Sequence, residues 1–286
     1  MLYALMMSMI QNDQATALRM MAKWLKRDND ELFDSEKQNQ TARTIAITSG
    51  KGGVGKTNIT ANLALAMIMQ QAKVGIIDAD LGLANIDVIL RLKPKYNLEH
   101  VVSGEKKLSE IFVNGPAGLT IIPASPGRIP MASLSELDRN MLIKELIRAT
   151  GIFDITFIDT AAGISDNVID FAVAAQEVIV ITTPEPTAIT DAYAMIKVIS
   201  HRKDSNIGII VNMAQSSDQA MNVGDRIILA ARRFINAKTH LVGYILRDSA
   251  VSDSVSSQEP LIFKYPESKA TKCINLLATK ILEKRF

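Results

Sequence analysis

The segment at residues 50–57, GKGGVGKT, is the feature that most constrains the fold. It follows the apolar run TIAITS and precedes a stretch with helical apolar spacing, so it joins a predicted strand to a predicted helix. Its spacing satisfies G-x-x-x-x-G-K-[ST], the pattern of a phosphate-binding loop. Glycines let the backbone curl until successive N–H groups point at phosphate oxygens at the positive end of the helix. We therefore predict a nucleotide-phosphate site here rather than a chance glycine turn.

The chain beyond residue 43 alternates between short aliphatic runs and longer helical patterns. The runs that predict strands are residues 44–48, 74–78, 119–123, 155–159, 178–182, 207–212 and 241–245. The helical patterns are residues 56–70, 137–150, 166–175, 188–202, 219–235 and 269–284. Aliphatic strands separated by helices indicate a parallel sheet covered on both faces. We predict one α/β domain over residues 44–286, doubly wound and mostly parallel, of the P-loop NTPase type.

Residues 1–43 have a different character and read as an N-terminal extension. Apolar residues recur at helical spacing over residues 12–27, with Asn12 or Asp13 as the N-cap. A polar, acidic stretch at residues 28–40 follows and is typical of a linker. The apolar residues 1–10 have neither a basic start nor a small-residue cleavage site, so we expect a cytoplasmic protein.

Composition excludes several classes of protein. The chain has one cysteine, Cys273, so it cannot hold a disulfide framework or a metal site built on several thiolates. Lysine and arginine number 32 against 30 acidic residues, and aromatic residues make up 5%. This balance gives no sign of nucleic-acid binding by the chain as a whole.

Individual residues of the loop and of two later strands suggest chemistry. In a phosphate loop of this pattern, Lys56 meets the β- and γ-phosphates and the Thr57 hydroxyl binds Mg²⁺. Asp78, Asp80 and Asp159 lie at or just after predicted strand ends, where α/β sheets bind ligands. Each aspartate could instead be an ordinary helix N-cap.

The second lysine of the loop, Lys51, gives the chain a more specific resemblance. The pattern K-G-G-x-G-K-[ST] resembles the deviant Walker A ATPases of the MinD and ParA family. In that family the first lysine reaches the partner's nucleotide across a dimer interface, which implies a homodimer with Mg-ATP and a catalytic role for Lys51 beside Lys56. A solvated surface lysine is the alternative.

The same resemblance assigns roles to the carboxylates and to two further positions. It implies that Asp80 positions the attacking water, that Asp78 and Asp159 hold Mg²⁺ through water, and that the Gly163 N–H senses the γ-phosphate. Asn212, at the end of the run IIVNMA, matches the amide that pairs with adenine, and residues 247–260 match the family's adenine-flanking loop. An ordinary turn is the alternative for Asn212. The ATP-binding residues implied are Gly50, Lys51, Gly52, Gly53, Val54, Gly55, Lys56, Thr57 and Asn212.

The extension points to one branch of the family. Residues 13–19, DQATALR, resemble the D-Q-A-x-x-L-R motif of the FlhG (FleN, YlxH) flagellar regulators, and DADLGLANIDV, NLEHVVSGE and EPTAITDAYAMIK resemble the same family. There the helix engages the SRP-type GTPase FlhF and stimulates its hydrolysis. The resemblance implies contacts to FlhF from Asp13, Gln14, Ala15, Leu18 and Arg19. An amphipathic helix that folds back on its own core is the alternative.

Other branches fit less well. The iron–sulfur carriers of this fold need paired cysteines, a ParA-type partition protein needs a basic DNA-binding surface, and the tyrosine kinases need a tyrosine-rich tail. Two positions depart from the FlhG pattern: Arg91 stands where relatives often have a small residue, and residues 251–260 lack basic residues common there. Neither departure touches the ATP site.

The last predicted helix, residues 269–284, has one apolar face. The first turns favour packing on the core, while transient membrane contact near the end is the alternative. The resemblance thus implies a slow, switch-type ATPase that regulates flagellar number or placement, with further partners in a flagellar transcription regulator or switch-complex protein. A Min-type division regulator, a ParA-like partitioning ATPase and a nucleotide-gated scaffold remain alternatives.

Overall fold

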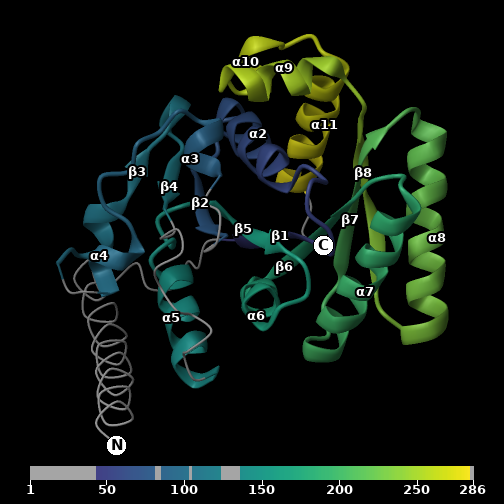
Figure 1. The fold of residues 1–286 in the computed structure, drawn as a ribbon, viewed down its shortest axis with the longest axis horizontal. Coiled ribbons are helices and arrows are strands. Elements are labelled where there is room, and N and C mark those ends of the chain that lie inside the picture. Colours follow the sequence, from purple (N-terminus) through teal and green to yellow (C-terminus); the bar gives the residue numbers. More distant parts are fainter. Residues whose placement is uncertain (1–42, 81–84, 103–104, 124–135, 284–286) are drawn as a thin grey trace, which may run out of the picture.

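The computed structural model describes residues 43–80, 85–102, 105–123 and 136–283. Its centre is an eight-stranded sheet of order β3-β4-β2-β5-β1-β6-β7-β8 (Figure 1). The strands are β1 (Arg43–Ser49), β2 (Val74–Ala79), β3 (Val113–Asn114), β4 (Thr120–Ile122), β5 (Ile155–Ala162), β6 (Glu177–Thr182), β7 (Ile207–Ala214) and β8 (Thr239–Leu246). Every neighbouring pair is parallel except β3 with β4. The predicted doubly wound fold is confirmed.

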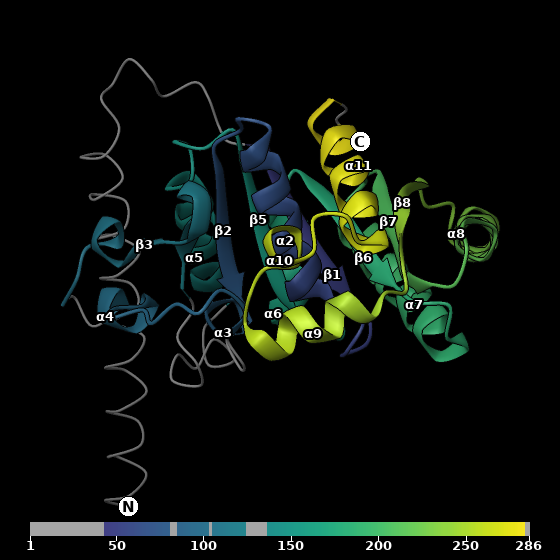
Figure 2. The same ribbon diagram turned by 90° about the horizontal axis from the view of Figure 1, so that it is seen from above.

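Helices cover both faces of this sheet (Figures 1 and 2). One face carries α2 (Lys56–Met69), α3 (Ile86–Ile89), α9 (Ser249–Ser257), α10 (Leu261–Lys264) and α11 (Lys269–Glu283). The other carries α5 (Glu136–Arg148), α6 (Asp166–Ala174), α7 (Pro186–Arg202) and α8 (Ser217–Ile235), and α4 (Leu98–Val102) lies near the β3 edge. Strand residues alternate between the two layers, with Ile45 and Ile47 in one core and Ala46 in the other. Two cores on one sheet explain why the strands read as unbroken aliphatic runs.

All seven predicted strands and all six helices of the domain are present, most within two residues of the predicted ends. The sequence reading missed β3, which has only two residues, and the short helices α3, α4 and α10. It also predicted a loop over residues 247–260, which contains α9 instead. The predicted helix at residues 12–27 and the linker at residues 28–40 lie outside the described residues.

The C-terminal helix α11 packs on the core, as predicted for its first turns. Its buried residues are Ala270, Thr271, Ile274, Leu277, Ala278 and Ile281. Arg43, which we had assigned to the extension, is the first residue of β1; it forms a buried ion pair with Glu177 and donates to the carbonyl of Ile281. This side chain thus joins two central strands to α11. Among the helices described, none has the length and apolar character needed to cross a bilayer.

Candidate nucleotide-binding site

The glycine-rich loop curls between the end of β1 and the start of α2. Gly53 and Gly55 have φ of 78° and 91°, the left-handed region that glycine adopts without strain. A Cβ on Gly50 would collide with the carbonyl of Asp191 in α7, and one on Gly55 would lie 2.6 Å from Asn212 Nδ2. Glycine is therefore required at these positions by conformation and by close packing, and α2 begins directly at Lys56.

Lys56 and Asp159 form the buried centre of the site. The Lys56 residue is 8% exposed and Asp159 is 1% exposed. Burial lowers the pKa of Lys56, while the charges of Asp159 and Asp80 oppose that shift. Burial raises the pKa of Asp159 to about 6, although Thr57 and Thr60 donate hydrogen bonds to it. The Thr60 Oγ1 lies 3.0 Å from Asp159 Oδ1 and 2.9 Å from the Lys56 carbonyl oxygen.

A second buried carboxylate stands beside Asp159. Asp78 pairs with Asp159 in the register of β2 and β5. It is 2% exposed, and burial together with the Asp159 charge raises its pKa well above the usual range. The Asp80 N–H donates to Asp78 Oδ1 at 3.1 Å, so Asp80 is held directly after β2. The structure thus brings together Lys56, Thr57 and all three predicted aspartates.

These groups suit a hard cation. Two buried carboxylates that lack full compensation, with the Thr57 hydroxyl beside them, offer the oxygen ligands that Mg²⁺ prefers. Within the described residues, no group of three or more His, Cys, Asp or Glu could hold a metal by itself. A magnesium ion here would therefore take phosphate oxygens and water as most of its ligands.

Lys51 lies at the other end of the loop and points away from the buried centre. Its Nζ contacts Glu185 Oε2 and Thr187 Oγ1, each at 3.0 Å. Its side chain is 40% exposed and that of Glu185 is 67% exposed. The ammonium group of Lys51 therefore lies at the surface, beside the start of α7.

Comparisons with known proteins agree with this geometry. A family model described as ParA, NUBPL iron-transfer P-loop NTPase, matches residues 40–282. The antiactivator FleN of Pseudomonas aeruginosa is 39% identical over 240 residues, covering 84% of this chain and 86% of FleN. The flagellum site-determining protein YlxH of Helicobacter pylori is 35% identical over 260 residues, covering 90% and 86%. The chain belongs to the FleN/YlxH branch of the MinD/ParA ATPases.

A solved structure supports the same family. MinD of Pyrococcus horikoshii OT3, in complex with Mg-ADP, superposes with a TM-score of 0.70 at 26% identity, covering 84% of this chain and 96% of that one. The family matched includes iron-transfer proteins. This chain has a single cysteine, Cys273, and therefore has no pair of thiolates that could hold iron.

The two remaining predicted nucleotide contacts lie against the loop in this MinD/ParA fold. The Gly163 N–H donates to the Ser49 carbonyl at 2.9 Å, and Gly163 has φ of 95°. The Asn212 Nδ2 donates to the Val54 carbonyl at 2.8 Å, and its Oδ1 accepts from the Met213 N–H at 2.9 Å. Asn212 therefore braces the phosphate loop through the amide that we predicted to pair with adenine; the adenine contact stays a prediction.

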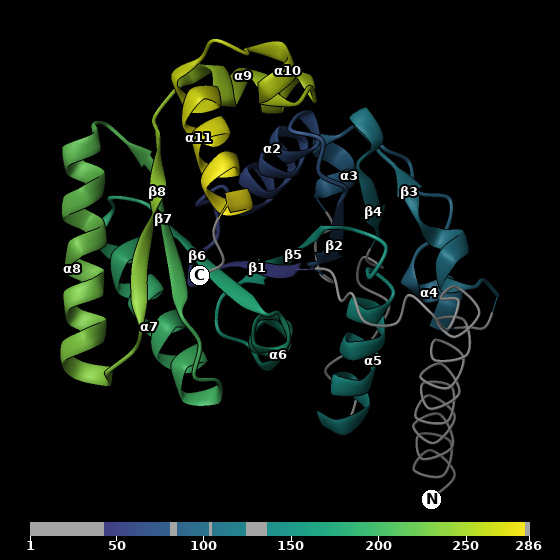
Figure 3. The ribbon, with the colours of Figure 1, turned by 180° about the vertical axis from the view of Figure 1, so that it is seen from behind.

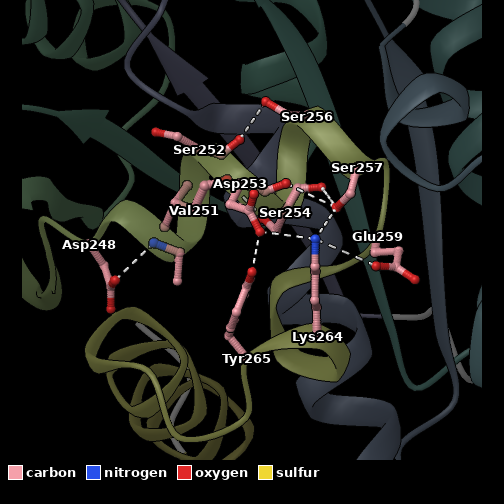
Figure 4. A network of polar contacts seen from close by, with 11 residues as sticks. Asp248, Val251, Ser252, Asp253, Ser254, Ser256, Ser257, Glu259, Lys264 and Tyr265 are labelled. Carbon is pink, nitrogen blue, oxygen red and sulfur yellow. Dashed lines mark hydrogen bonds and ion pairs between the residues drawn. The ribbon is translucent and has the colours of Figure 1, made fainter.

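Residues 247–260, predicted as the adenine-flanking loop, contain α9, and α10 follows directly; we call these two helices the hairpin. Figure 4 shows its polar network: Lys264 Nζ lies 2.7 Å from Ser257 Oγ and 3.0 Å from Asp253 Oδ2, and the Tyr265 hydroxyl donates to Asp253. Asp248 caps α9 by accepting from the Ala250 N–H at 3.0 Å. The Asn62 side chain of α2 accepts from the Ile262 N–H at 3.2 Å. The hairpin is thereby fixed to the helix that begins at the phosphate loop.

Sequence reasoning missed the residues that support the two lysines. Thr60 lies one turn after Lys56 in α2 and donates to Asp159. A polar threonine within the apolar run ITANLALAM could have indicated a buried hydrogen bond at this position. Glu185 and Thr187 lie 134 and 136 residues from Lys51, and no pattern in the sequence pointed to that contact.

Proposed function

We propose that this chain is a switch-type ATPase that dimerises with Mg-ATP and hydrolyses it slowly. The observation that carries the proposal is the separation of roles in the loop: Lys56 faces buried carboxylates, while Lys51 is exposed at the surface. A lysine at the surface beside a nucleotide site could exchange its exposed partner, Glu185, for the nucleotide of a second copy. ATP binding and dimerisation would then be one event.

In this proposal the residues of the site divide the reaction among them. Residues 50–57 and Lys56 bind the phosphates, and Asn212 contributes to the base side. Thr57, together with Asp78 and Asp159 through water, would hold Mg²⁺, and the ion would supply charge neutralisation at the phosphates. Asp80 orients a water that attacks the γ-phosphorus as the bond to the β-bridging oxygen breaks, which yields ADP and phosphate. The Gly163 N–H would exchange the Ser49 carbonyl for a γ-phosphate oxygen.

Sedimentation of two variants tests this reading. Lys51→Ala should bind ATP as a monomer and fail to dimerise, because the contact across the interface is lost. Asp80→Ala should accumulate as an ATP-bound dimer, because the water is no longer oriented. Normal ATP-dependent dimerisation of Lys51→Ala would refute the proposed role of Lys51.

We further propose that the ATPase regulates the number or placement of flagella. Its support is the 39% identity to the antiactivator FleN and the 35% identity to YlxH, both over more than four fifths of the chain. The partner of the extension would be an FlhF-type GTPase, contacted by Asp13, Gln14, Ala15, Leu18 and Arg19. A peptide of residues 11–27 should stimulate GTP hydrolysis by purified FlhF, and Gln14→Ala should abolish that effect.

A Min-type division regulator is the second candidate, favoured by the match to MinD structures. It shares the enzyme but needs no FlhF. Cells that lack the protein should show altered flagellar counts under the first proposal and misplaced septa under the second. Wild-type flagellar counts with Asp80→Ala would instead favour a nucleotide-gated scaffold in which hydrolysis is incidental.

A further inference from the structure

A short segment after α3 carries three exposed cations. From Arg91 to Tyr96 the residues alternate: Arg91, Lys93 and Lys95 are exposed, while the residues between and after them are partly buried. Leu92 packs against one hydrophobic core and Tyr96 against the other. Arg91 lies in the turn after α3 and Lys95 in a bend, and we call Arg91, Lys93 and Lys95 the basic strip.

The basic strip is not neutralised within the described parts of the chain. There, no carboxylate forms an ion pair with Arg91, Lys93 or Lys95. The nearby Glu110 is already engaged by Lys106 Nζ at 2.9 Å and by the Lys107 N–H at 2.8 Å. Lys95 and Lys106 lie over the Tyr96 ring, with Nζ 5.1 and 4.5 Å from its centroid. Lys106 and the Lys107 N–H are thus paired with Glu110, whereas the cations of the basic strip have no ion pair among the described residues.

The backbone at the strip is strained and is tied to α3. Arg91 has φ of 53°, the left-handed region that glycine would adopt freely. Its N–H donates to the Val88 carbonyl at 3.3 Å, and the Leu92 N–H donates to the Asp87 carbonyl at 2.8 Å. An arginine kept at a strained position, in place of a small residue, indicates that its charge has a use. The strip also follows Asp80 closely in the chain.

We propose that the basic strip binds the acidic segment of this chain's own extension, residues 28–36. That segment, DNDELFDSE, contains five acidic residues and no basic one. Asp28 and Asp30, and Asp34 and Glu36, repeat at the two-residue spacing of the strip. The carboxylates of that segment would neutralise the three cations of the basic strip.

Chain length permits this contact. The described chain begins at Arg43, so residues 28–36 are seven to fifteen residues away and can reach roughly 25–50 Å when extended. A lipid surface usually requires about four to eight clustered basic residues, more than the strip offers. A single-stranded nucleic acid would need an open aromatic face for stacking, and two lysines cover the ring of Tyr96. The acidic segment fits best.

Disulfide trapping in the full chain tests the proposal. In a Cys273→Ser background, Ser35→Cys is combined with Val88→Cys on α3, or with Met221→Cys on α8 as the matched control. Val88 and Met221 are 50% and 52% exposed, and α3 and α8 lie toward opposite ends of the sheet (Figure 3). We expect the intramolecular disulfide to Val88→Cys to form at least ten times faster than that to Met221→Cys at low protein concentration.

Charge reversal then assigns the cause. Replacing the strip with Arg91→Glu, Lys93→Glu and Lys95→Glu should lower the trapping rate to that of the control, and lysines at positions 28, 30, 34 and 36 should restore it. Equal rates in the two pairs, or no restoration, would overturn the proposal. A disulfide that forms between chains would assign the strip to a second copy and overturn it too. None of these outcomes depends on ATP hydrolysis or on FlhF.

Discussion

Lys51 and Lys56 belong to one loop and both face carboxylates, but they differ in burial. Lys56 is almost fully buried, and its neighbours are the carboxylates of Asp159 and Asp80. Lys51 is half-exposed, and its partners are the exposed Glu185 and the hydroxyl of Thr187. Water can replace the exposed partner of Lys51, whereas little water reaches the buried surroundings of Lys56. We therefore expect Lys51 to change position when nucleotide binds, and we expect Lys56 to stay in place.

The largest effect should follow from truncating the buried lysine. Lys56→Ala should weaken Mg-ADP binding at least 100-fold, about 3 kcal/mol, because the phosphates and Asp159 both lose their cation. Titration calorimetry measures this directly. Lys51→Ala is the matched variant and should bind Mg-ADP within about threefold of the parent. Equal losses in both variants would mean that the two lysines do not have separate roles.

A smaller effect should come from neutralising the buried carboxylate. The pKa of Asp159 is about 6 in the folded protein against an ordinary 3.8, so the folded state binds more protons than the unfolded state between these values. Ionisation of Asp159 therefore costs stability above pH 6, and that cost disappears as the pH falls below about 4. Asp159→Asn should raise the free energy of unfolding by about 2 kcal/mol at pH 8 and leave it unchanged at pH 4.

Urea unfolding without nucleotide or Mg²⁺ is the measurement for Asp159→Asn. Asp225→Asn, an exposed substitution on α8, serves as the control and should show no such pH dependence. If Asp159→Asn raised the free energy of unfolding by the same amount at pH 4 as at pH 8, the cause would be packing rather than the ionisation of Asp159.

The smallest effect belongs to the exposed ion pair. Glu185→Gln should loosen Lys51 and tighten Mg-ATP-dependent dimerisation about two- to fourfold, less than 1 kcal/mol. The gain should shrink at high salt, because exposed charges are screened. Glu267→Gln, which removes a more exposed ion pair with Lys272, should leave dimerisation unchanged. Weaker dimerisation of Glu185→Gln would show that Glu185 supports Lys51 rather than restrains it.

Much of the fold was predictable because its signals are local. The aliphatic runs of β1, β2 and β5 and the loop between β1 and α2 have patterns contained within a few residues. Helix α9 was missed because its sequence, SAVSDSVSS, is serine-rich and has a weak apolar period, and a polar network holds it in place.

The site was predictable where strand ends carry the chemistry. Asp78 and Asp159 come together because parallel strands end at one edge of the sheet. The supporting contacts were not predictable, since Arg43 with Glu177 and Lys51 with Glu185 each join residues 134 apart. Asn212 illustrates the limit: its position was foreseen, but its bond to the Val54 carbonyl depends on a loop shape that spacing does not encode.

The close fit of Gly50 against α7 has a mechanical consequence. Helix α7 has 17 residues and is about 25 Å long, and its far end carries Arg202, which pairs with Asp166 and Asp170 of α6. Because Gly50 packs directly against the backbone of α7, a displacement of the loop would displace α7 as a rigid body. A change in the occupant of the nucleotide site would thereby be transmitted to α6, which lies beside α7 on the same face of the sheet.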